Sequence, residues 1–281
     1  MSGAQTAAVA LAQAIVALRA TQNPDAASEA RILLAAALGV ERGQLVTSLD
    51  RVLNVTETGR YLQMIAARQN FQPISQILGR REFWSRRFVV TPDVLDPRPD
   101  SETLIAAALD DHFSRVLDLG TGSGALIVTL LAERAQATGL AVDISPAALH
   151  VAAQNAAKHG VSARLEFRES DWLAQVDGEF DLIICNPPYI DEAEWAELAP
   201  DVRDHEPKLA LTPGRDGLQV YRALAGQLDA YLAPNGRVLF EIGYQQGAQV
   251  VALMQAQGWA LPQLVKDING HDRLVLLTKA K

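Results

Sequence analysis

Three stretches near the start of the chain repeat apolar residues three and four positions apart, which is the spacing of one face of an α-helix. They cover residues 4–20, 26–38 and 56–69. Asn23-Pro24-Asp25 and Thr56-Glu57-Thr58 combine residues that are typical of helix starts. We therefore expect residues 1–75 to form a small helical domain.

The pattern changes after Gln72-Pro73-Ile74. Between Arg81 and Leu95 many apolar positions are aromatic or β-branched, which favours strands over helices. We expect residues 76–100 to contain a β-hairpin that links two domains. The proline-stiffened segment from Asp96 to Glu102 then leads into a helix.

Beyond residue 103, short apolar runs rich in β-branched residues alternate with helical patterns. The strand-like runs lie at 115–119, 140–143, 164–168, 180–185, 237–241, 261–267 and 272–279, and the helical patterns at 124–134, 146–159, 217–232 and 244–257. This alternation predicts an α/β fold with a doubly wound, seven-stranded, mostly parallel sheet and helices on both faces. Asn269-Gly270 predicts an antiparallel hairpin at the sheet edge. This second domain would span residues 101–281.

The run 180–185 ends in Asn186-Pro187-Pro188-Tyr189, which is an unusual way to leave a strand. Proline fixes its own φ, lacks an N–H and pushes the preceding residue into an extended conformation. The Asn186 amide oxygen and the Pro187 carbonyl would then be held side by side as two hydrogen-bond acceptors, with the Tyr189 ring close by. Such a pair can receive an NH2 group. The simpler interpretation is a strand-ending turn with a buried tyrosine.

The first strand of the sheet leads into a glycine-rich loop, Gly120-Thr121-Gly122-Ser123-Gly124. Glycines allow a backbone to approach a ligand closely, and the helix N-terminus that follows favours an anion. Asp143 ends the second strand, where a carboxylate can accept both hydroxyls of a ribose, and Trp172, just after the third, offers a face to an adenine ring. A tight turn, a helix cap and a half-buried tryptophan are the plainer interpretations.

Charge and cysteine content narrow the possible partners. Residues 1–100 carry 11 Lys+Arg against 9 Asp+Glu, whereas residues 101–281 carry 14 against 24. The second domain, at −10, would repel a phosphate backbone. Cys185 is the only cysteine, so no intrachain disulfide is possible and a buried, inert thiol is expected. No segment near the start is long and apolar enough to predict a membrane span, and the cytoplasm is the simplest location.

One basic cluster stands out, Arg80-Arg81 with Arg86-Arg87. Four arginines in eight residues could meet an acidic partner or a nucleic acid. A solvated hairpin edge is the more usual meaning of such a cluster.

Together these motifs resemble the class I S-adenosylmethionine-dependent methyltransferases. The loop Asp118-x-Gly120-x-Gly122-x-Gly124, the acidic and aromatic strand ends and Asn-Pro-Pro-Tyr mark the branch that methylates planar NH2 groups. Within it the chain is similar to the HemK/PrmC-type protein N(5)-glutamine methyltransferases over nearly its whole length. Further matching segments include residues 97–102, Gly214-x-Asp216-Gly217-Leu218 and Glu241-Ile242-Gly243. Asp96 and the arginine-rich hairpin depart from the family pattern.

The resemblance implies a Rossmann-like methyltransferase sheet and a release-factor-binding role for residues 1–75. It implies that the substrate is the glutamine of the Gly-Gly-Gln motif in class I peptide-chain release factors. No metal, nucleic acid or membrane is expected to take part, and we expect a monomer. The implied roles are S-adenosylmethionine binding by Gly120, Thr121, Gly122, Ser123, Gly124, Asp143, Trp172 and Asn186, substrate binding by Asn186, Pro187, Pro188 and Tyr189, and catalysis by Asn186, Pro187 and Tyr189.

Two alternatives remain open at the level of the sequence. A nucleic-acid methyltransferase acting on the exocyclic amino group of adenine or guanine could use the same acceptor pair, with the tyrosine stacked on a flipped base. A dinucleotide-dependent dehydrogenase or a silent nucleotide-binding module could use a glycine loop. The loop lacks the spacing Gly-x-Gly-x-x-Gly, however, and neither a dehydrogenase nor a silent nucleotide-binding module explains Asn-Pro-Pro-Tyr.

Overall fold

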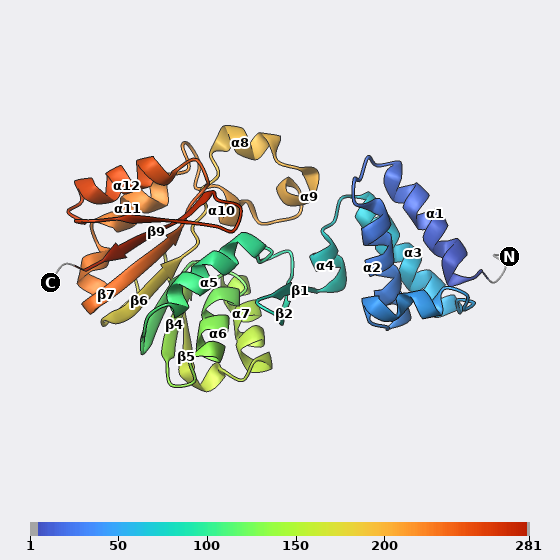
Figure 1. Ribbon diagram of the computed structural model, residues 1–281, viewed down its shortest axis with the longest axis horizontal. Helices are drawn as coiled ribbons and strands as arrows, with labels where there is room; N and C mark the ends of the chain where they lie inside the picture. The colour runs from blue at the N-terminus through green and yellow to red at the C-terminus, as the bar shows by residue number, and fades with distance from the viewer. Residues whose placement is uncertain (1–4, 280–281) are drawn as a thin grey trace. The chain divides into compact units, whose positions relative to one another are not determined.

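The computed structural model describes residues 5–279, which divide into two compact units. The N-terminal unit comprises residues up to Gly79 together with Pro200–His205. The second, which we call the sheet unit, comprises Arg80–Ala199 and the chain from Glu206 onward. The chain therefore passes between the two units three times. Figure 1 shows the elements of each unit.

The N-terminal unit is built from helices whose apolar stripes meet in one core. The helices are α1 (Ala7–Arg19), α2 (Ala26–Leu38), α3 (Val55–Gln69) and α4 (Ile74–Leu78), with a 3-10 helix at Arg42–Ser48. Leu18, Leu33 and Leu34 are fully buried in this core. The buried Tyr61 hydroxyl donates to the Ala30 carbonyl at 3.0 Å and so ties α3 to α2. The expected small helical region is confirmed.

The start of α3 differs slightly from the expected one. Asn54, rather than the Thr56-Glu57-Thr58 group, caps the helix: its side chain accepts from the Glu57 N–H at 2.9 Å. The Glu57 carboxylate in turn accepts from the Asn54 N–H at 3.1 Å. This reciprocal capping box satisfies two backbone donors at once, which explains why the helix begins at Val55.

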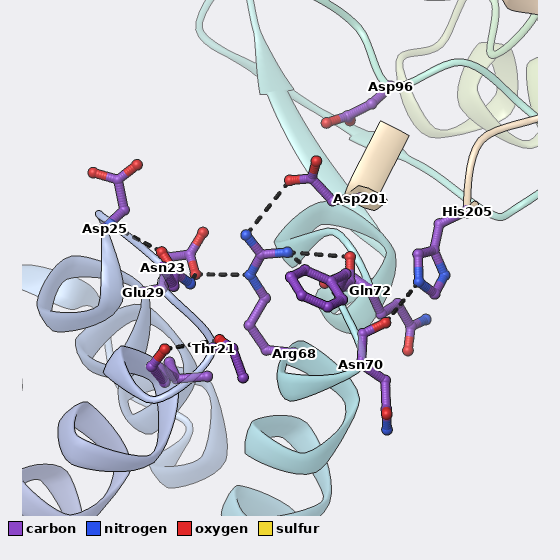
Figure 2. Close-up of polar contacts among 12 residues, drawn as sticks. Thr21, Asn23, Asp25, Glu29, Arg68, Asn70, Gln72, Asp96, Asp201 and His205 are labelled. Atoms are coloured by element: carbon purple, nitrogen blue, oxygen red, sulfur yellow. Dashed lines mark hydrogen bonds and ion pairs between the residues drawn. The ribbon is translucent and has the colours of Figure 1, made fainter. Parts of the chain in front are cut away.

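Arg68 on α3 binds Pro200–His205, the segment from the second half of the chain that belongs to the N-terminal unit. The Arg68 side chain is only 10% exposed and lies 2.7 Å from the Glu29 carboxylate and 3.5 Å from that of Asp201. It also donates to the carbonyls of Phe71 and Gln72. Figure 2 shows these acceptors surrounding the guanidinium. Arg68 therefore joins α2, α3, the turn after α3 and the short helix α9 (Pro200–Arg203).

Two further hydrogen bonds fix the end of the same segment. The His205 ring nitrogen Nε2 lies 2.8 Å from the Asn70 carbonyl, so this nitrogen must carry the proton. The Gln76 side chain donates to the His205 carbonyl at 2.8 Å. Pro200–His205 is thus bound at both ends to the N-terminal unit.

We expect Arg68→Met to release this segment. The change leaves the half-buried Glu29 carboxylate without its cationic partner, which should destabilise the N-terminal unit by about 2 kcal/mol. Hydrogen exchange followed by mass spectrometry should show faster exchange of amides 201–205 than in the wild type. The matched control is Arg222→Met, which breaks the more exposed pair with Asp216 and should leave those amides unchanged. Equal protection in the Arg68 variant and the wild type would contradict this prediction.

The sheet unit opens with the expected hairpin, β1 (Arg80–Phe83) paired antiparallel with β2 (Arg86–Val89). Its arginines contact acids of the same unit. Arg86 lies 2.8 Å from Glu133, and Arg81 lies 3.6 Å from Asp96, which is 5% exposed. Asp96 and the basic hairpin both depart from the family pattern, and the ion pair between Arg81 and Asp96 joins them.

The large sheet has seven strands in the order β5-β4-β3-β6-β7-β9-β8. These strands are β3 (Arg115–Leu119), β4 (Thr138–Asp143), β5 (Leu165–Glu169), β6 (Phe180–Cys185), β7 (Leu232–Glu241), β8 (Gln263–Lys266) and β9 (Asp272–Thr278). All neighbouring pairs are parallel except those made by β9, which runs antiparallel to β7 and β8. The predicted α/β sheet with an antiparallel edge hairpin is confirmed.

Helices cover both faces of this sheet (Figure 1). On one face lie α5 (Glu102–Leu109), α6 (Ala125–Glu133) and α7 (Pro146–Lys158), and on the other α11 (Gln219–Ala225) and α12 (Gly247–Ala256). The strands between them are buried on both sides, which explains their continuous apolar runs.

Two helical regions differ from the expected ones. The helix predicted over 217–232 ends at Ala225, and a 3-10 helix follows at Leu228–Tyr231 after Gly226, which is a poor residue for a helix interior. The sequence also indicated no elements between 190 and 211. That stretch forms α8 (Glu192–Glu197), α9 and α10 (Lys208–Leu211), which are too short to show a helical period.

Candidate active site

The predicted site residues follow four neighbouring strands at the same edge of the sheet. Leu119, at the end of β3, pairs with Val142 in β4 and with Cys185 in β6. Asp143 in turn pairs with Glu169, the last residue of β5. Strand order reverses between β3 and β6, and open α/β sheets bind ligands at such a point. The glycine loop and Asn186 thus leave adjacent strands.

The glycine loop is a left-handed turn that only glycines adopt without strain. Gly120, Gly122 and Gly124 have φ values of 73°, 55° and 76°. A Cβ added at Gly122 would meet no atom within 4 Å, so the loop presents bare backbone to open space. Asn155 supports the loop from α7 by donating to the Ser123 carbonyl at 2.9 Å.

Asp143 holds the glycine loop against the start of α7. Its carboxylate accepts from the Gly122 N–H and from the Ser145 N–H, each at 2.9 Å. Burial raises the pKa of Asp143, and these backbone donors oppose the shift. An ionised carboxylate has about four lone-pair directions, so these backbone donors leave room for a ligand hydroxyl. The backbone-binding role of Asp143 and the proposed ribose-binding role are therefore compatible.

Asp118 was not singled out as a site residue, yet it lies directly beneath the loop. It is 1% exposed, and it accepts from the Thr121 hydroxyl at 2.7 Å. Burial raises the pKa of Asp118 to about 7, partly offset by that hydrogen bond. The Thr121 side chain therefore faces inward, and this residue would meet a cofactor through its backbone.

Trp172 packs against the glycine loop. An added Cβ at Gly120 would lie 3.3 Å from the Trp172 ring, so the indole stands over the first glycine. Trp172 itself has a φ of 50°, and the Ser170 hydroxyl donates to its carbonyl at 2.8 Å. The indole is half-buried, so part of it remains accessible.

Asn186 is half-buried and Pro187 is buried at the end of β6. The Asn186 Nδ2 lies 3.4 Å from the hydroxyl of Ser101, to which it donates. Because the amide nitrogen is engaged on the protein side, the Oδ1 oxygen is left as an acceptor. Ser101 belongs to a 3-10 helix (Pro99–Ser101) within the proline-stiffened segment that leads into α5.

Two further residues, to which the sequence assigned no role in the site, lie against Tyr189. The Gln246 side chain donates to the Tyr189 carbonyl at 2.8 Å and accepts from the Gly243 N–H at 3.0 Å. Gly217 passes so close that an added Cβ would lie 2.2 Å from the same carbonyl. Gly217 also has a φ of 67°, so both space and conformation require glycine here.

Glu241 ends β7 beside this loop and is 1% exposed. Burial raises its pKa to about 7, and hydrogen bonds from Ser101 and Tyr189, together with the charge of Arg273, oppose the shift. Its Oε2 atom is buried without a hydrogen-bond partner. Burial also raises the pKa of Tyr189, so its hydroxyl stays protonated and can donate.

The raised pKa of Glu241 predicts a pH dependence of stability. The folded protein binds this proton more tightly than the unfolded chain does, so the contribution is full below the unfolded pKa of 4.5 and is lost as the pH rises to about 7. The loss amounts to roughly 3 kcal/mol. Glu241→Gln should therefore be more stable than the wild type near neutral and higher pH. Urea unfolding across this range tests it, and an unchanged pH slope would contradict it.

Comparison with known proteins gives the family. The model of the methyltransferase small domain matches residues 82–201, and that of the PrmC N-terminal domain matches residues 9–79. The release factor glutamine methyltransferase of Cereibacter sphaeroides is 52% identical, over 96% of this chain and 97% of the relative. That of Rhodospirillum rubrum is 43% identical, over 88% and 77%.

Solved structures show the same fold at lower identity. The hMettl16 catalytic domain has a TM-score of 0.57 and 17% identity, over 82% of this chain and 84% of that one. A methyltransferase from Pyrococcus furiosus has a TM-score of 0.53 and 16% identity, over 69% and 89%. The chain belongs to the family of release factor glutamine methyltransferases, which use S-adenosylmethionine as the methyl donor.

Proposed function

We propose that this protein transfers a methyl group from S-adenosylmethionine to the side-chain amide nitrogen of the glutamine in the Gly-Gly-Gln motif of class I release factors. One observation carries the proposal beyond the family membership. The Nδ2 of Asn186 donates to the Ser101 hydroxyl at 3.4 Å, which leaves Oδ1 available as an acceptor. An acceptor at this position suits an incoming NH2 group.

The chemistry requires positioning above all. An amide nitrogen is a poor nucleophile because its lone pair is delocalised into the carbonyl. If Asn186 Oδ1 and the Pro187 carbonyl accept its two N–H bonds, positive charge that develops on nitrogen is stabilised and the lone pair is directed at the methyl group. Tyr189 would pack against the flat amide, with Pro188 closing the loop. No general base is needed before the transfer.

The residues around the glycine loop fit an adenosine-bearing cofactor. S-adenosylmethionine supplies the electrophilic methyl group when it is bound. Asp143 would accept from ribose hydroxyls, and the half-buried Trp172 would face the adenine. The backbone of Gly120, Thr121, Gly122, Ser123 and Gly124 would line the cofactor, and Asn186 would lie where cofactor and substrate meet. The bare backbone at Gly122 supports this fit.

The N-terminal unit supports a protein substrate. Its helices correspond to the PrmC N-terminal domain, and relatives that share both matched regions are named for release factors. We propose that residues 1–75 help to bind the release factor, that the enzyme acts as a monomer in the cytoplasm, and that it needs no nucleic acid. The balance of −10 over residues 101–281 argues against a polynucleotide substrate. Within residues 5–279 no helix is long and apolar enough to cross a membrane.

A labelling experiment tests the proposal. Purified protein is incubated with methyl-labelled S-adenosylmethionine and a class I release factor, and the label is mapped by mass spectrometry. Parallel reactions contain a release factor whose Gly-Gly-Gln glutamine is replaced by alanine, and DNA or RNA. We expect label on that glutamine alone. Label on an adenine or guanine amino group, with none on glutamine, would refute the proposal.

A further inference from the structure

The loop Asn186-Pro187-Pro188-Tyr189, which we call the catalytic loop, lies against a buried carboxyl that the mechanism above does not use. Cys185 in β6 pairs with Phe240 in β7, so the next residues along the two strands, Asn186 and Glu241, leave the sheet side by side. A buried carboxyl without full hydrogen bonding is costly. Glu241 is nevertheless placed there, with Oε2 unpartnered.

Ser101 connects this carboxyl to Asn186. It is 3% exposed, it accepts from Asn186 Nδ2 at 3.4 Å, and it lies close enough to the Glu241 carboxyl to lower the pKa of that group. Ion pairs fix the backbone on the N-terminal side of Ser101. Arg98 binds both oxygens of the buried Glu206 at 2.7 and 2.8 Å, and Asp100 lies 3.0 Å from Arg273.

Above about pH 7, where Glu241 is ionised, its carboxylate gives this hydrogen-bond chain one direction. A carboxylate only accepts, so the Ser101 hydroxyl must donate to it. The Ser101 oxygen then has only lone pairs to offer Asn186, and the Asn186 amide must turn its nitrogen toward Ser101. The amide oxygen is consequently turned toward the ligand. Without the carboxylate, Ser101 could instead donate to Asn186 Oδ1, and the amide could present its NH2 group to the substrate.

The same carboxyl also holds Tyr189. The Tyr189 hydroxyl lies close enough to Glu241 to lower the pKa of that carboxyl, while the Tyr189 carbonyl accepts from Gln246 at 2.8 Å. One buried acid therefore contacts both polar side-chain systems of the catalytic loop, Asn186 through Ser101 and Tyr189 directly. Arg273 and Asp100 are the other charged groups close to it.

We propose that Ser101 and Glu241 are positioning residues that set the direction of the Asn186 amide, so that the loop recognises a hydrogen-bond donor, an NH2 group, rather than an acceptor. This inference rests on the proposed role of Asn186 as an acceptor. Ser101 and Glu241 would then help to determine which nucleophile the enzyme accepts, although neither residue touches the substrate.

The first test replaces the serine. We expect Ser101→Ala to lower kcat about 10- to 100-fold, because the Asn186 amide is no longer oriented. The KM for S-adenosylmethionine should stay close to that of the wild type. Ser101→Thr keeps the hydroxyl and should recover most of the lost activity. A kcat for Ser101→Ala within about threefold of the wild type would overturn the proposal.

Glu241→Gln provides a second, independent variant. The glutamine amide can donate to Ser101, which removes the fixed direction of the chain while keeping the shape. We expect a similar loss in kcat even though this variant unfolds at higher urea concentration than the wild type near pH 8. A purely structural role would lower activity only together with stability. Wild-type kcat in this stabilised variant would overturn the proposal, even if Ser101→Ala proves too unstable to assay.

Tyr221→Phe is the matched control. The Tyr221 hydroxyl donates to the backbone carbonyl of Glu241 at 2.7 Å and does not define the chain direction. This variant should lose stability but keep kcat. The assays first identify the group that the wild type methylates. If that group is a nucleic-acid amine, the proposed substrate is wrong, whereas the ratio of variant to wild-type kcat on that amine still decides the role of Ser101 and Glu241.

Discussion

Asn186→Ala is expected to lower kcat for glutamine methylation by about 10³-fold, while the affinity for S-adenosylmethionine falls only modestly. Removing one preorganised hydrogen-bond partner of a developing charge has an effect of this size in other enzymes. Here the lost partner is Oδ1, the oxygen left unengaged when Nδ2 donates to Ser101. The Pro187 carbonyl remains and accounts for residual activity.

Single-turnover transfer of labelled methyl to a release factor measures this effect, and calorimetry measures cofactor binding in the same preparation. Asn269→Ala removes an asparagine side chain from an exposed turn and serves as the control. Full activity in the Asn186 variant would rule out the acceptor mechanism. A loss of cofactor affinity as large as the loss of kcat would assign Asn186 to cofactor binding instead.

Asp143→Ala is expected to raise the Kd for S-adenosylmethionine about 100-fold. Removing the carboxylate would abolish two charge-assisted hydrogen bonds to the ribose, which together are worth about 3 kcal/mol. It would also release the Gly122 and Ser145 N–H groups, which are held at 2.9 Å. The glycine loop would then be less well ordered before binding.

Asp143→Asn separates these two contributions, because its amide oxygen can still accept from one backbone N–H and its charge is gone. An intermediate Kd is expected for it. Asp177→Ala, at an exposed carboxylate, should bind like the wild type. At saturating cofactor, kcat of the Asp143 variants should approach the wild-type value. Unchanged affinity in Asp143→Ala would contradict the ribose-binding role.

The structure places the two contiguous motifs of the predicted site where the sequence put them, at the ends of adjacent strands. In the glycine loop and in Asn186-Pro187-Pro188-Tyr189, the glycines and prolines themselves determine the backbone conformation. The strands before them could be recognised from apolar runs. The alternation of strands and helices was sufficient to predict the sheet and to put the loops at one edge.

Local patterns assigned no role to the supporting residues, although the family resemblance included the segments that contain Ser101 and Glu241. Ser101, Glu241 and Gln246 lie far along the chain from Asn186. The pairing of β6 with β7 brings Glu241 beside it, whereas Ser101 comes from the 3-10 helix before α5 and Gln246 from the start of α12. Each is an ordinary residue for its local context: a helix cap, a strand end and a helix start. The capture of Pro200–His205 by the N-terminal helices was hidden for the same reason, since no local pattern around Asp201 or His205 indicates a distant partner.

That captured segment has a consequence for the order in which the protein is made. The helices up to Gly79 leave the ribosome early, but the residues that complete their unit, Pro200–His205, are synthesised only after β3, β4, β5 and β6. At roughly 5–20 residues per second of translation, the gap is on the order of ten seconds. During that interval Arg68 has Glu29 but not Asp201 as a partner. The first unit to emerge is therefore finished only after most of the second has been translated.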